Sequence, residues 1–135
     1  MTKLNKKTIL NDFDNMLEKF DIQLKENGDS LRERDVYISF LVRTYKTSKQ
    51  RMQVADTLAG HMAKSDDENY DHASLAMDVI SCMTFLAGDL DSTEFLLDEV
   101  EPHPTNNLRA LISQSVRACR DGIMTPKGFE EAFNV

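Results

Sequence analysis

Asp89 and Asp91 are the residues of this chain whose type and spacing come closest to catalytic chemistry. Together with Thr93 they form the pattern Asp-x-Asp-x-Thr. Carboxylates can act as nucleophiles, as general acids or bases, and as ligands of a Mg²⁺ ion. Here the motif follows a helical apolar pattern, which favours a turn that caps a helix.

The Asp-x-Asp-x-Thr pattern is similar to the motif of haloacid-dehalogenase-type phosphatases. The resemblance implies a metal-dependent phosphatase in which Asp89 is the nucleophile and Asp91 the general acid and base beside Mg²⁺, with the motif at the end of a buried strand. We keep this activity as an alternative hypothesis. The same stretch does not match a calcium-binding loop, because Glu94 stands where that loop requires glycine. No zinc-binding spacing is found among the histidines and cysteines, which are His61, His72, His103, Cys82 and Cys119. The prediction is therefore a protein that is not an enzyme and uses no metal or cofactor.

Length and composition bound the class of protein. A chain of 135 residues with 41% hydrophobic residues can bury one core without disulfides or metals, so we predict a single domain over residues 1–135. No apolar run approaches the roughly 18 residues that a membrane span needs, and no signal peptide is visible. Cys82 and Cys119 fall on apolar helix faces, where buried free thiols are expected. A cytoplasmic location is the resulting expectation.

The charges are unevenly divided along the chain. Residues 1–51 contain 11 Lys and Arg and 8 Asp and Glu, a net charge of +3. Residues 52–135 contain 5 Lys and Arg and 15 Asp and Glu, a net charge of −10. Solvated outer faces of helices would account for this division. The functional interpretation is a surface with one positively and one negatively charged region, which steers protein partners by electrostatic attraction.

Two groups of residues are candidates for contact with a partner. The basic group consists of Tyr37, Arg43, Tyr45, Lys46, Lys49 and Arg51. The acidic group consists of Asp89, Asp91, Glu94, Asp98, Glu99 and Glu101. The function predicted from these groups is a small acidic non-catalytic protein that binds another protein, as an adaptor, regulator or inhibitor. An alternative is an acidic mimic of nucleic acid that occupies a basic groove of its partner. Direct binding of nucleic acid or of a membrane is not predicted.

Helical periodicity covers most of the chain. Apolar residues recur at spacings of three and four, which predicts helices over residues 8–25, 30–46, 48–64, 71–87, 92–101 and 107–120 and a short last helix after Pro126. No segment alternates with a period of two, so the predicted fold is all-α, a compact domain of six to seven short helices. Apolar residues crowd residues 36–42, which predicts that the second helix is the central one.

The first predicted helix has an apolar seam of the heptad type, formed by Leu10, Phe13, Leu17, Phe20 and Leu24. We expect this seam to pack on the core of the same chain, with a homodimer through the seam as the alternative.

Several helix ends are signalled by neighbouring residues. Gly28 suits the left-handed conformation that ends a helix, and Ser30 begins a capping box. Thr47 is expected to cap the third helix and Thr125 the last one. Asp91, with Glu94 three residues later, is expected to cap the fifth.

Residues 71–106 have the pattern of a helical hairpin with a tight turn at Gly88. Leu86 and Leu97 are expected to face each other in its core, with Val100 on the second helix and Pro104 closing it. This hairpin resembles one unit of the tetratricopeptide repeat family, which implies a pair of packed helices. A second resemblance rests on the order of four short segments: Arg34-Asp35-Val36, residues 86–89, Leu111-Ile112, and Gly122 with Pro126. This order is similar to that of an uncharacterised helical domain of actinobacterial proteins, and the resemblance implies the fold alone.

Overall fold

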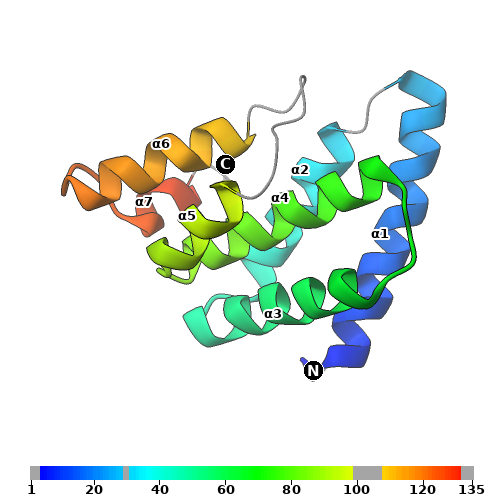
Figure 1. Ribbon diagram of the computed structural model, residues 1–135, viewed down its shortest axis with the longest axis horizontal. Helices are drawn as coiled ribbons and strands as arrows, with labels where there is room; N and C mark the ends of the chain where they lie inside the picture. The colour runs from blue at the N-terminus through cyan, green and yellow to red at the C-terminus, as the bar shows by residue number, and fades with distance from the viewer. Residues whose placement is uncertain (1–3, 29–30, 99–107, 132–135) are drawn as a thin grey trace.

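Seven α-helices form the regular structure of the residues that the computed structural model describes, which are 4–28, 31–98 and 108–131. The helices are α1 Lys6–Asn27, α2 Leu31–Thr44, α3 Ser48–Lys64, α4 Tyr70–Leu86, α5 Leu90–Asp98, α6 Leu108–Arg120 and α7 Pro126–Glu130. Consecutive helices such as α1 and α2, or α3 and α4, pack antiparallel (Figure 1). The prediction of an all-α fold with hairpin packing is confirmed. In the described part of the chain, no helix combines the length and apolar character that crossing a membrane requires.

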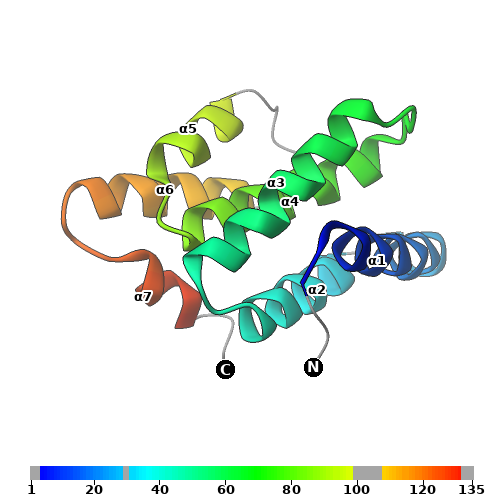
Figure 2. The same cartoon turned by 90° about the horizontal axis from the view of Figure 1, so that it is seen from below.

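The centre of the fold is α4. It packs against α2, α3, α5, α6 and α7, and the two views show it enclosed among its neighbours (Figures 1 and 2). Residues 78–86 are all buried. The prediction that the second helix is central is therefore wrong. Val36 and Phe40 lie one turn apart on the outer face of α2 and are 53% and 42% exposed, so α2 is buried on one face only.

The predicted turn between α4 and α5 is confirmed at Gly88. Its φ of 90° lies in the left-handed region that favours glycine. The Gly88 amide donates to the carbonyl of Phe85 at 2.9 Å, and the Asp89 amide donates to the carbonyl of Thr84 at 3.2 Å. These two bonds pair carbonyls that the end of α4 would otherwise leave without a partner.

Most of the predicted caps are also confirmed. The side chains of Thr47 and Thr125 accept hydrogen bonds from the amides at the start of α3 and α7, and Gly28 ends α1 with a φ of 78°. The prediction that Asp91 caps the fifth helix is wrong, because α5 begins two residues earlier than expected and its first turn is bound by Asp89. The predicted cap at Ser30 lies outside the described residues.

The apolar face of α1 belongs to the core of the same chain. Phe13 and Phe20 are 1% and 7% exposed, and the other buried residues of this helix are Ile9 and Met16. Leu10, Leu17 and Leu24 are only half-buried. The two phenylalanines of the predicted seam are therefore buried, while Ile9 and Met16 take the places expected for Leu10 and Leu17. Since the two phenylalanines pack inside this fold, their side chains are not available for contact with a second copy in a homodimer through that seam.

The hairpin of α4 and α5 is less completely covered than predicted. Leu86 is buried, but Leu97 is only half-buried. Phe95 on α5 is 65% exposed, and Leu111 on α6 is 48% exposed. α5 has only nine residues, so it covers one side of the end of α4 and leaves its own outer face in solvent. Val100 and Pro104 lie outside the described residues.

Candidate functional site

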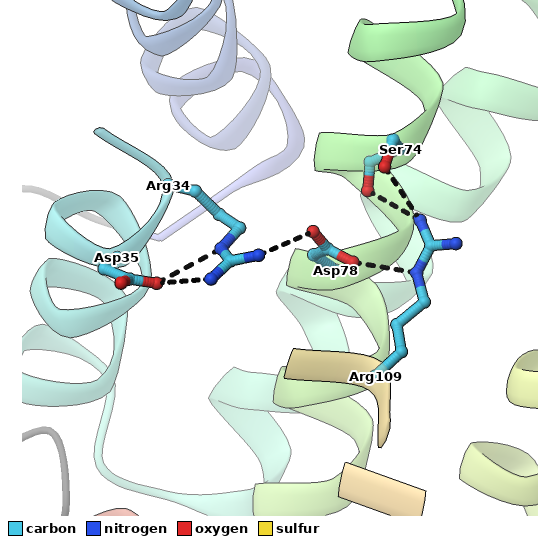
Figure 3. Close-up of polar contacts among 5 residues, drawn as sticks. All are labelled: Arg34, Asp35, Ser74, Asp78 and Arg109. Atoms are coloured by element: carbon cyan, nitrogen blue, oxygen red, sulfur yellow. Dashed lines mark hydrogen bonds and ion pairs between the residues drawn. The ribbon is translucent and has the colours of Figure 1, made fainter. Parts of the chain in front are cut away.

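A network of charged side chains around the buried Asp78 joins α2, α4 and α6 (Figure 3). Asp78 of α4 is 2% exposed, and its carboxylate accepts a hydrogen bond from Arg109 Nε of α6 at 2.8 Å. On its other side Asp78 lies 3.6 Å from Arg34 Nη1 of α2. Arg34 also donates to Asp35, and Arg109 donates to the carbonyl and hydroxyl oxygens of Ser74 at 3.1 Å. Two guanidinium groups and two carboxylates therefore form a network without net charge.

This buried network has a structural rather than a chemical role. Arg34 and Arg109 are 8% and 5% exposed, so a substrate has no route to the carboxylate between them. Arg34, Asp78 and Arg109 come from three different helices, and the network therefore fixes how α2, α4 and α6 meet. It was not predicted from the sequence, although Asp78 offered a signal. Asp78 is the one charged residue among residues 75–86, which are otherwise mostly apolar.

The predicted acidic group divides into three kinds of residue. Asp89 is bound locally, since Oδ1 accepts from the Ser92 amide at 3.0 Å and Oδ2 from the Ser92 hydroxyl at 2.7 Å. Hydrogen bonds from that side chain and amide lower the pKa of Asp89. Asp91 and Glu94 both accept hydrogen bonds from Arg120 of α6. Asp98 is exposed. The other two predicted acids, Glu99 and Glu101, lie outside the described residues.

Asp89 and Asp91 do not have the surroundings that phosphatase chemistry requires. They lie at the start of α5, after a helix, and no strand occurs in the described ranges. Asp89 is held by Ser92 and the Asp91 carboxylate lies 2.5 Å from Arg120. The two carboxylates therefore have separate structural partners. Within the described residues no group of three His, Cys, Asp or Glu side chains is arranged to hold a metal ion.

Two members of the predicted basic group are buried, which corrects their assignment as surface contacts. Arg51 lies on the same face of α3 as Val54 and Leu58 and is 4% exposed. It donates to the carbonyls of Tyr45 and Val42 at the end of α2, at 2.8 and 3.0 Å, and to Glu130 of α7. The Arg51 guanidinium therefore interacts with groups inside the fold and does not face a partner at the surface.

Tyr37 is the second buried member. It is 5% exposed and packs against the Phe13 ring, with ring centroids 6.4 Å apart. No described residue forms a hydrogen bond with its hydroxyl. Burial, together with the nearby charges of Asp12 and Tyr45, raises the pKa of Tyr37 well above its usual range. The rest of the basic group, Arg43, Lys46 and Lys49, is exposed, and Tyr45 is half-buried.

One groove of about 380 Å³ lies between α1 and α2. Its apolar wall includes Val36 and Phe40, whose side chains are partly exposed. Its charged residues are two acids and two bases, namely Asp12, Glu33, Lys19 and Arg43. Because the signs balance, this groove favours neither a basic nor an acidic partner.

A second groove of about 380 Å³ lies between α3 and α5, and we name it the α3–α5 groove. Ala55 of α3 and Ile80 and Thr84 of α4 form its floor, and each is 2% exposed. Its apolar walls include Met52 of α3 and Leu96 and Phe95 of α5. Phe95 is 65% exposed, the second-highest exposure among the large hydrophobic side chains described. This groove is thus apolar and open to solvent.

The charged side chains that line the α3–α5 groove are Asp56 and Asp91, and both are exposed. Asp56 forms no ion pair with another described residue. Asp91 shares Arg120 with Glu94, and one guanidinium between two carboxylates leaves a net negative charge. The groove therefore has an apolar floor and an acidic rim. Asp91 was predicted from the sequence as a contact residue, whereas the exposed Phe95 and the groove itself were not predicted.

His72 links α1 to the start of α4. Its Nδ1 lies 2.7 Å from Asp67 and its Nε2 lies 2.7 Å from Asp21. Partial burial opposes the charged form, but the hydrogen bonds to these carboxylates outweigh it and raise the pKa of His72 above 6.5. The arrangement fits a protonated imidazole that donates from both nitrogens.

The two cysteines are free thiols, and the prediction that they are buried is confirmed for one of them. Cys82 of α4 is fully buried, and burial raises its pKa to about 12. Cys119 of α6 is half-buried, and burial raises its pKa as well. Because the thiolate is the reactive form, Cys82 is poorly suited to act as a nucleophile.

Comparisons with models of protein families, with curated proteins and with solved structures find no match to this chain. The resemblances to a tetratricopeptide hairpin and to an actinobacterial helical domain therefore remain predictions, and the function has to be inferred from the geometry of the chain itself.

Proposed function

We propose that this chain is a small non-catalytic helical protein that binds another protein, and that the partner binds at the α3–α5 groove. The observation that carries the proposal is the exposure of Phe95, 65%, at the edge of an apolar groove. Large aromatic side chains that contact water beside an apolar depression are typical of protein interaction surfaces. A partner that covered Phe95 would remove this apolar surface from water.

Contact through an apolar groove is better supported than imitation of nucleic acid. A mimic needs a row of carboxylates that are free to enter a basic groove of the partner. Asp91 and Glu94 are instead paired with Arg120, and Asp89 is bound to Ser92. Asp98 is the exposed acid of α5 that has no such partner among the described residues.

To test the proposal, the 135-residue chain is immobilised and incubated with a lysate of the cells that express it. Bound proteins are then cross-linked to the chain and identified by mass spectrometry. The test variant is Phe95→Ser. Because Phe95 is largely exposed, the substitution should leave thermal unfolding nearly unchanged. We expect a defined protein to cross-link to the native chain and to be lost with the variant.

The matched control is Leu111→Ser, which removes an exposed apolar side chain from α6, outside the α3–α5 groove. This variant should retain the partner at both low and moderate salt. The proposal would be abandoned if no specific protein is captured, or if Phe95→Ser captures it as well as the control does.

A further inference from the structure

We infer that the occupant of the α3–α5 groove is an amphipathic helix of the partner, apolar on one face and flanked by lysine or arginine. This inference rests on the proposed function and adds the chemistry of the partner segment. It follows from three properties of the groove: its charged rim, its hydroxyl donors, which are already used within the chain, and its length.

The rim of the groove selects a basic segment. Asp56 on α3 and Asp91 on α5 stand on opposite sides of the apolar floor, and both carboxylates are exposed. A lysine or arginine on each flank of the bound segment can meet one of them. The part of the chain that supplies most of α3 and all of α5 is acidic as well, because residues 52–135 carry a net charge of −10. This surface attracts cationic segments and repels anionic ones before contact is made.

The floor selects a segment whose backbone needs no partner. Two hydroxyl groups line the groove, and both already donate within the chain. Thr84 Oγ1 donates to the Ile80 carbonyl at 2.7 Å, and Ser92 Oγ donates to Asp89 at 2.7 Å. An extended peptide would leave its amides and carbonyls against apolar side chains, which is costly. A helix pairs its own backbone groups and offers only side chains.

The length of the groove sets the number of contacts. Along α3 the groove extends from Met52 to Ala59, which at a rise of 1.5 Å per residue is about 10 Å, or two helical turns. A partner helix that lies along this distance presents apolar residues at positions i, i+3 or i+4, and i+7. Phe95, opposite α3, can pack against that apolar face.

The test uses the full-length chain and two labelled synthetic peptides of equal length. Both peptides carry leucine at i, i+3, i+4 and i+7; one has lysine on its polar flanks, and the other has glutamate at the same positions. Binding is measured by fluorescence anisotropy, and helix formation by circular dichroism of the mixture against the separate components. We expect the lysine peptide to bind and to gain helix, and the glutamate peptide to bind more weakly.

Variants locate the binding to the groove. Phe95→Ala should weaken binding of the lysine peptide about tenfold or more, as truncation of an interface anchor does, whereas Leu111→Ala should leave it unchanged. Asp56→Lys should weaken it by at least about twofold. Asp98→Lys makes the same change of net charge at an exposed site outside the α3–α5 groove and should have a smaller effect.

Several results would overturn the inference. Equal affinity for the two peptides, or an Asp98→Lys effect as large as that of Asp56→Lys, would indicate that the charged rim does not select the occupant. Binding without a gain of helix would indicate an extended occupant. If the chain associates with itself and Phe95→Ala abolishes this association, the occupant of the groove is a second copy of the chain. If the lysine peptide fails to bind while a cellular protein is still captured through Phe95, the inference is wrong and the proposed function stands.

Discussion

Replacement of Asp78 by asparagine should strongly destabilise this protein. The carboxylate lies 2.8 Å from Arg109 Nε and 3.6 Å from Arg34 Nη1, and the three residues are each no more than 8% exposed. Asparagine has nearly the same shape but no charge. Asp78→Asn therefore leaves two guanidinium groups in the interior without the anion they share.

The expected cost follows from that imbalance. Removing one member of a buried ion pair costs about 3–5 kcal/mol, because the remaining charge stays desolvated. A domain of this size has a free energy of unfolding of about 5–15 kcal/mol. With a urea dependence of roughly 1–3 kcal/mol per molar, the unfolding midpoint should fall by at least about 1 M. Circular dichroism during urea titration measures this shift.

The matched control is Asp35→Asn. Asp35 also pairs with Arg34, at 2.9 Å, but its side chain is 55% exposed, so its loss should cost less than about 1 kcal/mol. If Asp78→Asn proves no more costly than Asp35→Asn, the buried network does not hold the helices together and the reasoning is refuted. A triple variant with Arg34→Met, Asp78→Leu and Arg109→Met should recover much of the stability, because apolar side chains need no counterion.

Three further predictions concern packing and titration. Leu86→Ala, at a side chain 6% exposed, should cost about 2–5 kcal/mol in urea unfolding, whereas Leu111→Ala, 48% exposed, should change it by about 0.5 kcal/mol or less; equal costs would contradict the assignment of faces. His72 has a folded-state pKa raised above 6.5, so its pairing with Asp21 and Asp67 stabilises the fold fully below pH 6.5, and this contribution is lost as the pH rises through the folded-state pKa. The difference in stability between the native chain and His72→Gln should therefore shrink with rising pH, and a constant difference would argue against the pairing. Finally, a thiol reagent should modify Cys82 only after unfolding, as quantified by mass spectrometry; rapid labelling of the folded chain would show that α4 opens.

The features that were predicted correctly depend on residues close together in the sequence. Thr47 and Thr125 cap helices through amides three positions later, and Gly88 ends a helix through carbonyls within five positions. Helical periodicity is likewise set by residues three and four apart. These interactions are specified by residues that are neighbours in the sequence, so the all-α fold and most helix ends could be predicted from it.

The errors concern which way a side chain faces. Arg51 and Tyr37 were assigned to a contact surface together with the other members of the basic group. Arg51 is buried because the carbonyls at the end of α2 and the carboxylate of Glu130 can pair with its charge. Those partners lie six or more residues away in the sequence, and they come together only when α2, α3 and α7 pack. Asp78 and its two arginines were missed for the same reason.

Local sequence thus accounts for short amphipathic helices joined by tight turns, and for a net negative charge after residue 51, where bases are few. Which helix is enclosed, and which apolar side chains stay in water, depends on how the helices pack. α4 became the centre because α2, α3, α5, α6 and α7 all pack on it. Phe95 stayed exposed because the nine-residue α5 contacts α4 and α6 with its inner face and no described segment covers the other. Periodicity shows that a helix has an apolar face, but whether that face is covered depends on neighbours from distant parts of the chain.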